Sequence, residues 1–170
     1  MSDSSLRERQ APLKEQYRND PSAAIITLAA EGKLSDGVSC SVSTAKGIAL
    51  AGLHPATGGT GQELCSGDML LEALVACAGV TLSAVSTSLG IELRDATVRA
   101  EGDLDFKGTI AVDREAPVGF TDIRLSFTLD TDAAQDQVES LLKLTQRYCV
   151  VLQTLRSSPA VTVTQRSPSG

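Results

Sequence analysis

The sequence is poor in aromatic residues and in histidine, and each shortage removes a class of function. Among 170 residues there are 3 Phe, 2 Tyr, no Trp and a single histidine, His54. So few aromatic rings leave little surface on which nucleic-acid bases could stack. A net charge of -6, without a basic tract, offers few contacts to phosphate groups. We therefore expect no nucleic-acid partner.

Cysteine is also scarce, with four residues that are too few and too widely spaced for a disulfide framework or a zinc ribbon. The glycine run at residues 58–61 lacks the Lys-Ser/Thr pair of a phosphate-binding loop, and we interpret it as a surface loop. We therefore expect no metal and no cofactor. The cysteines remain as the main reactive groups.

The N-terminal region shows no apolar segment of the kind found in a signal peptide, because residues 1–19 are charged and polar. The longest nearly uncharged stretch, residues 69–89, is interrupted by Glu72 and rich in small residues, which argues against a membrane span. We expect a cytoplasmic protein with no membrane partner. In a reducing compartment, a cysteine is more often reactive than structural.

The length favours a single domain, and the hydrophobic pattern predicts a mixed α+β fold. One-face alternation in the strands indicates an antiparallel sheet that packs on helices. The predicted helices cover residues 4–18, 68–89 and 132–148, with 149–156 as a continuation or a separate piece; the predicted strands cover 23–30, 38–44, 97–105, 123–129 and 161–165, with a short strand and a turn within 106–120.

The helix at residues 68–89 carries the strongest pattern. Ser66 or Asp68 is expected to cap its beginning, and Gly90 its end. Its apolar residues surround most of the helix, whereas one sheet of about six strands covers only one side. A second copy of the chain would cover the rest, so we expect a homodimer.

Cys77 lies in the middle of this helix, and Cys149 lies at the break before residues 150–156. In one interpretation they form a redox pair, in which Cys77 is oxidised to a sulfenic acid and Cys149 resolves it as a disulfide. In the other, each is a small buried apolar side chain. Cys40 fits the second interpretation, and Cys65, in the loop before the helix, has no assigned role.

A reactive thiol must be deprotonated, which requires positive charge nearby. Cys77 follows Asp68 by nine residues, too far for the N-terminus of its own helix to act. Another segment would have to supply an Arg or Lys. Arg147 is the nearest candidate in sequence, and Arg18 is a second.

Two segments resemble the cysteine motifs of the OsmC/Ohr family. Residues 66–82, with the run Ser-Gly-Asp-Met-Leu-Leu-Glu-Ala-Leu-Val-Ala before Cys77, are similar to the family's central-helix motif. Residues 147–155, with Arg-Tyr before Cys149, are similar to its second cysteine motif, 72 residues after the first. The resemblance spans roughly residues 23–165. We therefore expect an OsmC-like domain at 23–166. The sequence pattern predicts an N-terminal helical extension at 1–22 before it and a disordered tail at 167–170 after it.

The family resemblance implies an intertwined homodimer, in which an antiparallel sheet wraps around two long central helices. It also implies a thiol-dependent peroxidase for organic hydroperoxides or hydrogen peroxide, with Cys77 as the peroxidatic thiol and Cys149 as the resolving one. A small dithiol or lipoyl-type molecule would be the reductant, in oxidative-stress defence. Arg147 is the candidate stabiliser of the thiolate, and Asp68 or Glu63 would orient that Arg. The alternative is a non-catalytic dimer that binds an apolar small molecule at its interface, or a redox sensor.

Overall fold

The computed structural model describes residues 15, 19–20, 27, 31–35, 39–43 and 48–167. Apart from Glu15 and Thr27, the helix expected at 4–18 and the strand expected at 23–30 lie outside these residues. The domain boundaries remain predictions.

The first sheet has four strands in the order β1-β2-β3-β4. They are β1 (Glu31–Ser35), β2 (Ser39–Ser43), β3 (Ile48–Gly52) and β4 (Leu64–Cys65). The first three are antiparallel, and the two-residue β4 runs parallel to β3. β2 confirms the strand expected at 38–44, whereas β1 and β3 were not predicted because neither segment alternates clearly.

The second sheet is an antiparallel ribbon of β5 (Asp95–Leu104) and β6 (Phe120–Asp130), which confirms the strands expected at 97–105 and 123–129. The prediction of a single six-stranded sheet is wrong for the described residues, because these strands pair in two separate sheets of four and two. Within 106–120 the structure has the short helix α3 (Phe106–Thr109) and turns instead of a strand. The Asp105 side chain caps α3 by accepting a hydrogen bond from the Lys107 N–H, at 3.0 Å.

The strand expected at 161–165 is also absent from the described part of the chain. The segment alternates Val161 and Val163 with threonines, yet both valines are exposed. Alternation alone does not make a strand, because the backbone N–H and C=O groups need a neighbouring strand to bond to.

The central helix α2 (Ser66–Leu89) confirms the prediction in type and length. Gly90 caps its end at φ 68°, in the left-handed region that favours glycine. The N-cap is Cys65, so the expectation of Ser66 or Asp68 is wrong by one to three residues; both lie inside the first turn. The 3-10 helix η2 (Pro55–Thr57) lies in the loop that precedes α2.

Two further helices follow the ribbon. α4 (Gln135–Tyr148) begins three residues later than expected, where the Gln137 side chain accepts a hydrogen bond from the Ala134 N–H at 3.0 Å. α5 (Val150–Arg156) is a separate helix, and Cys149 is both the C-cap of α4 and the N-cap of α5.

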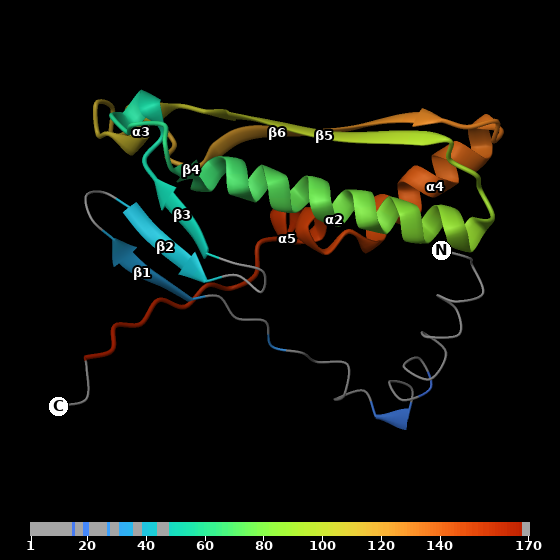
Figure 1. Ribbon diagram of the computed structural model, residues 1–170, viewed down its shortest axis with the longest axis horizontal. Helices are drawn as coiled ribbons and strands as arrows, with labels where there is room; N and C mark the ends of the chain where they lie inside the picture. The colour runs from blue at the N-terminus through green and yellow to red at the C-terminus, as the bar shows by residue number, and fades with distance from the viewer. Residues whose placement is uncertain are drawn as a thin grey trace.

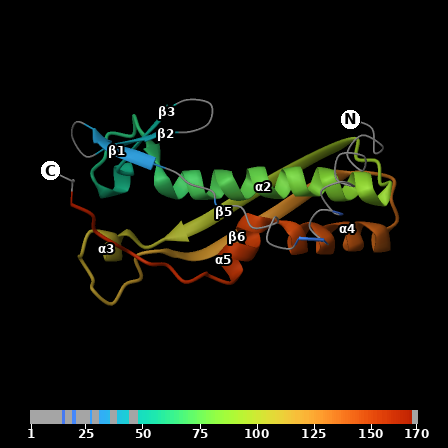
Figure 2. The same cartoon turned by 90° about the horizontal axis from the view of Figure 1, so that it is seen from below.

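The ribbon and the helices form two layers. In Figure 1 β5 and β6 run above α2, and Figure 2 shows α2 and α4 side by side with the ribbon crossing behind them. The inward side chains of the ribbon pack on two groups of buried residues: Leu74, Ala78, Cys149 and Leu152 in one, and Leu82, Val85, Ile91 and Leu141 in the other. Burying these apolar side chains is the main stabilising force of the domain.

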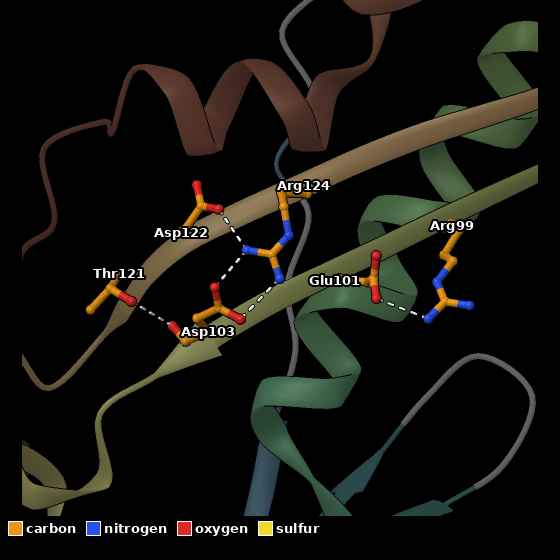
Figure 3. A network of polar contacts seen from close by, with 6 residues as sticks. All are labelled: Arg99, Glu101, Asp103, Thr121, Asp122 and Arg124. Carbon is orange, nitrogen blue, oxygen red and sulfur yellow. Dashed lines mark hydrogen bonds and ion pairs between the residues drawn. The ribbon is translucent and has the colours of Figure 1, made fainter.

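The outer face of the ribbon is polar (Figure 3). Arg124 bonds Asp103 of β5 at 2.5 Å and Asp122 of its own strand at 2.6 Å, and Arg99 bonds Glu101 at 2.8 Å. These side chains are about half exposed or more, so water screens each ion pair and the pair contributes little to stability. The ribbon therefore presents one face to water and the other to the helices.

The expectation for α2 was burial on nearly every side, and the structure buries one face. Leu74, Ala78, Leu82 and Val85 are buried, whereas Ala73, Ala76 and Val80 are exposed, Val80 by 73%. By length and composition alone α2 could cross a membrane, contrary to the expectation for residues 69–89. A core helix passes the same test, and the buried face of α2 packs against the ribbon, α4 and α5.

Candidate active site

The structure brings Cys77 and Cys149 together where the middle of α2 meets the junction of α4 and α5. The two side chains interact directly, and both thiols are free. Cys149 is 0% exposed, and Cys77 is partly buried against the apolar group that contains Cys149. Two segments that are 72 residues apart in sequence thus meet at a pair of sulfur atoms.

Backbone amides favour the thiolate of Cys77. Burial raises the pKa of this thiol, but the N–H of Val151, the Cys149 thiol and the N–H of Val150 outweigh burial, and the pKa lies below its ordinary value. Val150 and Val151 are the first residues of α5, where amides have no carbonyl partner within the helix. They are therefore free to donate to a sulfur anion.

The environment of Cys149 acts in the opposite direction. Burial is the main cause that raises its pKa, and the negative charge that forms on Cys77 raises it further, against the lowering effect of the Leu152 N–H. When two thiols interact and their environments differ, the first proton leaves mainly from one of them. Cys77 is therefore the thiol of the pair that loses its proton first.

Thr81 completes the surroundings of Cys77. Its hydroxyl donates to the Cys77 carbonyl at 2.7 Å, and it also lowers the pKa of the Cys77 thiol. Neither Thr81 nor the two valine amides was predicted from the sequence. A threonine four residues after a helical cysteine, and a helix break at the second cysteine, are the signals that could have found them.

The structure does not bring Arg147 to the thiols. Arg147 is exposed, and its guanidinium lies over the ring of the neighbouring Tyr148, 5.8 Å from the centroid. It is not among the groups that set the pKa of Cys77.

Asp68 and Glu63 lie at the N-terminal end of α2. Asp68 is nine residues before Cys77, a rise of about 13 Å along the helix. Glu63 precedes the helix, and its carboxylate accepts a hydrogen bond from the Thr60 hydroxyl at 2.6 Å. Neither carboxylate orients an arginine towards Cys77 in the described part of the chain.

Cys65 lines a small cavity of about 150 Å³ at the same end of α2, together with His54 and Asp68. The Nδ1 atom of His54 accepts a hydrogen bond from the Ala56 N–H at 3.0 Å, and its ring stacks on Phe106 with centroids 5.0 Å apart. Within the described ranges no three His, Cys, Asp or Glu residues are arranged to hold a metal ion.

A larger cavity of about 630 Å³ lies between β6, α4 and α5. Its wall combines apolar side chains of β6, α4 and α5 with a similar share of polar surface, to which Thr121, Asp122, Gln146 and Arg156 contribute. The side chains of Gln146 and Arg156 bond each other at 3.1 Å. Leu152 lines this cavity and also packs in the group that contains Cys149. The cavity is within the range of about 300–1,000 Å³ in which proteins bind small molecules.

Solved structures share this fold. An OsmC-like protein from Mycoplasma pneumoniae superposes with a TM-score of 0.66 at 13% identity, covering 78% of this chain and 89% of that one. An organic hydroperoxide resistance protein from Elizabethkingia anophelis superposes with a TM-score of 0.63 at 15% identity, covering 79% of this chain and 91% of that one. An organic hydroperoxide resistance protein from Legionella pneumophila has a TM-score of 0.60 at 19% identity, and the match covers 78% of this chain and 91% of that one. At these identities the likeness shows the fold alone.

A search of curated proteins finds no match. The family model described as OsmC-like protein matches residues 59–164, which include α2, the ribbon, α4, α5 and both cysteines of the pair. This match covers more than half of the chain, and the α+β architecture agrees with it. The chain therefore belongs to the OsmC-like family.

Proposed function

We propose that this protein is a thiol-dependent peroxidase that reduces organic hydroperoxides or hydrogen peroxide, in oxidative-stress defence. The observation that carries the proposal is the direct interaction of Cys77 with the buried Cys149, in surroundings that favour the thiolate of Cys77 and the thiol of Cys149. A nucleophilic thiolate beside a protonated thiol is the arrangement that a two-cysteine peroxidase requires.

In the first step the Cys77 thiolate attacks the terminal oxygen of the peroxide. The S–O bond forms, the O–O bond breaks, and the alkoxide leaves and takes a proton to become an alcohol, or water when the substrate is hydrogen peroxide. Cys77 is oxidised to a sulfenic acid, and the peroxide gains two electrons. The amides of Val150 and Val151 favour the thiolate before attack.

In the second step Cys149 attacks the sulfur of the Cys77 sulfenic acid. The S–S bond forms, the S–O bond breaks, and the hydroxide leaves with the Cys149 proton as water. A small dithiol, such as a lipoyl group, then exchanges with the disulfide, becoming a cyclic disulfide itself and returning both cysteines to thiols. The direct interaction of the two side chains supports this step.

The names of related structures support the same reaction. The Legionella pneumophila and Elizabethkingia anophelis structures are described as organic hydroperoxide resistance proteins. Their identities of 19% and 15% leave the activity of this chain as a proposal.

We further propose that the protein acts as a cytoplasmic homodimer. The exposed stripe of Ala73, Ala76 and Val80 on α2 supports a second copy, because small apolar side chains allow two helices to approach closely. Light scattering on a size-exclusion column measures the mass directly, and a monomer at micromolar concentration would contradict this part of the proposal.

A non-catalytic binding protein or redox sensor is the second candidate. The cavity of about 630 Å³ beside α5 favours it, because Leu and Phe side chains form part of its wall. In this case a bound apolar molecule would raise the melting temperature of the protein, and peroxide would not be consumed catalytically.

Peroxide consumption in the presence of dithiothreitol separates the two candidates. We expect catalytic turnover of cumene hydroperoxide by the wild type and a loss of about a thousandfold or more in Cys77→Ser, because the reaction loses its nucleophile. Cys65→Ser is the matched control. It should retain activity, since Cys65 is the N-cap of α2 and lies about three helical turns before Cys77. Equal rates in the wild type and Cys77→Ser would refute the peroxidase.

A further inference from the structure

Thr145 of α4 has a buried hydroxyl that nothing satisfies. Its side chain is 0% exposed, and its Oγ1 atom has no hydrogen-bond partner among the described residues. Helical hydroxyls of α2 do have hydrogen-bond partners: Thr81, Ser86 and Thr87 each donate to a backbone carbonyl three or four residues earlier. Burying an unpaired hydroxyl costs free energy of folding, so its retention calls for an explanation.

The position of Thr145 links it to Cys149. The Cys149 N–H donates to the Thr145 carbonyl at 3.0 Å, so helical spacing persists between the two residues. Side chains four residues apart on a helix share a face, with Cβ atoms about 5–6 Å apart. Threonine has alternative staggered rotamers, and a rotation about χ1 is enough to move the hydroxyl relative to the Cys149 sulfur.

Cys149 has to become an anion in an apolar site when it attacks oxidised Cys77. From α2 it faces Leu74 and Ala78, with Cys77 as the titratable group, and from α5 it faces Leu152. The Leu152 N–H is the main donor that already favours its charged form. A second donor nearby would lower the barrier to forming that charge.

We propose that Thr145 is a positioning residue for the resolving step, and that its hydroxyl donates a hydrogen bond to the Cys149 sulfur as that sulfur becomes the attacking thiolate. This inference rests on the proposed function, in which Cys149 resolves oxidised Cys77. The hydroxyl has no partner in the described part of the structure, where both thiols are reduced, and the hydrogen bond to the Cys149 sulfur forms during the reaction.

The test uses 4,4′-dithiodipyridine, which reports on Cys149 without any peroxide. The Cys77 thiolate attacks one sulfur of the reagent, forming a mixed disulfide and releasing one thiopyridone. Cys149 then attacks the Cys77 sulfur, forming the protein disulfide and releasing a second thiopyridone. Both releases are followed by absorbance with one equivalent of reagent, in the full chain with Cys40 and Cys65 replaced by serine.

In this background we expect Thr145→Val to leave the first release unchanged and to slow the second about tenfold, with its pH midpoint displaced upwards, because a bond to a charged group is lost. Thr145→Ser keeps the hydroxyl and should restore the rate. Thr154→Val, at an exposed threonine of α5, is the matched control and should behave as the parent. The melting temperature of Thr145→Val should not fall, since a methyl group replaces an unpaired hydroxyl.

A second release at the parental rate and pH midpoint in Thr145→Val overturns the inference, as does a parallel slowing of both releases with a lower melting temperature. The proposed peroxidase fails separately: if the wild type consumes no peroxide, the thiopyridone releases still measure whether Thr145 assists Cys149.

Discussion

The beginning and the middle of α2 differ in which segments surround their reactive side chains. At the beginning of α2, Cys65, His54, Asp68 and Glu63 lie close in sequence, and His54 and Glu63 bond mainly to their own loop. In the middle of α2, Cys77 has aliphatic neighbours in sequence, yet it meets Cys149 and the free amides of α5.

This difference teaches that the pKa of Cys77 is lowered by the backbone of a segment distant in sequence and not by a charged neighbour along the chain. The first turn of α5 supplies backbone N–H donors, which carry no formal charge. Amino-acid composition therefore gives no sign of them. At the beginning of α2, in contrast, His54 and Glu63 form hydrogen bonds with residues of their own loop.

The largest expected difference between the two regions of α2 concerns the lifetime of the Cys77 sulfenic acid when Cys149 is removed. In Cys149→Ser, the Cys77 sulfenic acid has no thiol beside it and should persist at least about a hundredfold longer, then proceed to sulfinic acid with excess peroxide. Dimedone trapping followed by intact mass spectrometry measures the lifetime. In the control Cys65→Ser the sulfenic acid should disappear as fast as in the wild type; equal lifetimes in both variants would break the comparison.

Removing one amide of α5 tests the backbone directly. Val150 begins α5 and follows Cys149, whose backbone is extended at φ -72° and ψ 104°, so proline fits there. Because the Val150 N–H lowers the pKa of Cys77, its loss in Val150→Pro raises that pKa, and the thiolate should then form only at higher pH. We expect the midpoint of iodoacetamide modification of Cys77 to move to higher pH.

Val150→Ala keeps the amide and is the matched control. An equal midpoint in Val150→Pro and Val150→Ala would show that the amide does not favour the thiolate.

The smallest effects are expected at the charged residues proposed from sequence. Arg147→Ala, Asp68→Ala and Glu63→Ala should each change the rate of peroxide consumption by less than about twofold, because none of these side chains contacts Cys77. A tenfold or greater fall in the rate of peroxide consumption in Arg147→Ala would identify Arg147 as the thiolate stabiliser. It would also contradict the conclusion that backbone amides have this role.

The sequence was sufficient for the elements with a strong local pattern. The alternation of Ile123, Leu125 and Phe127 predicted β6, and the apolar run up to Gly90 predicted α2. The residues alone left two interpretations of Cys77 and Cys149 open, the motif resemblance implied a redox pair, and the structure brings the two side chains together.

What could not be predicted depends on contacts between segments. Residues 161–165 alternate like a strand, but among the described residues no strand pairs with them, and the six strands described there divide into two sheets. The role of the Val150 and Val151 amides required knowing that the first turn of α5 meets the middle of α2. A single sequence carries no direct record of which distant segments meet.

Peptide mapping after one equivalent of cumene hydroperoxide tests the central claim, that Cys77 and Cys149 work as one redox pair. The account predicts a disulfide between these two cysteines in most of the molecules, with Cys65 still a free thiol. Recovery of Cys77 and Cys149 as separate thiols, or of a disulfide that involves Cys65 instead, would contradict it.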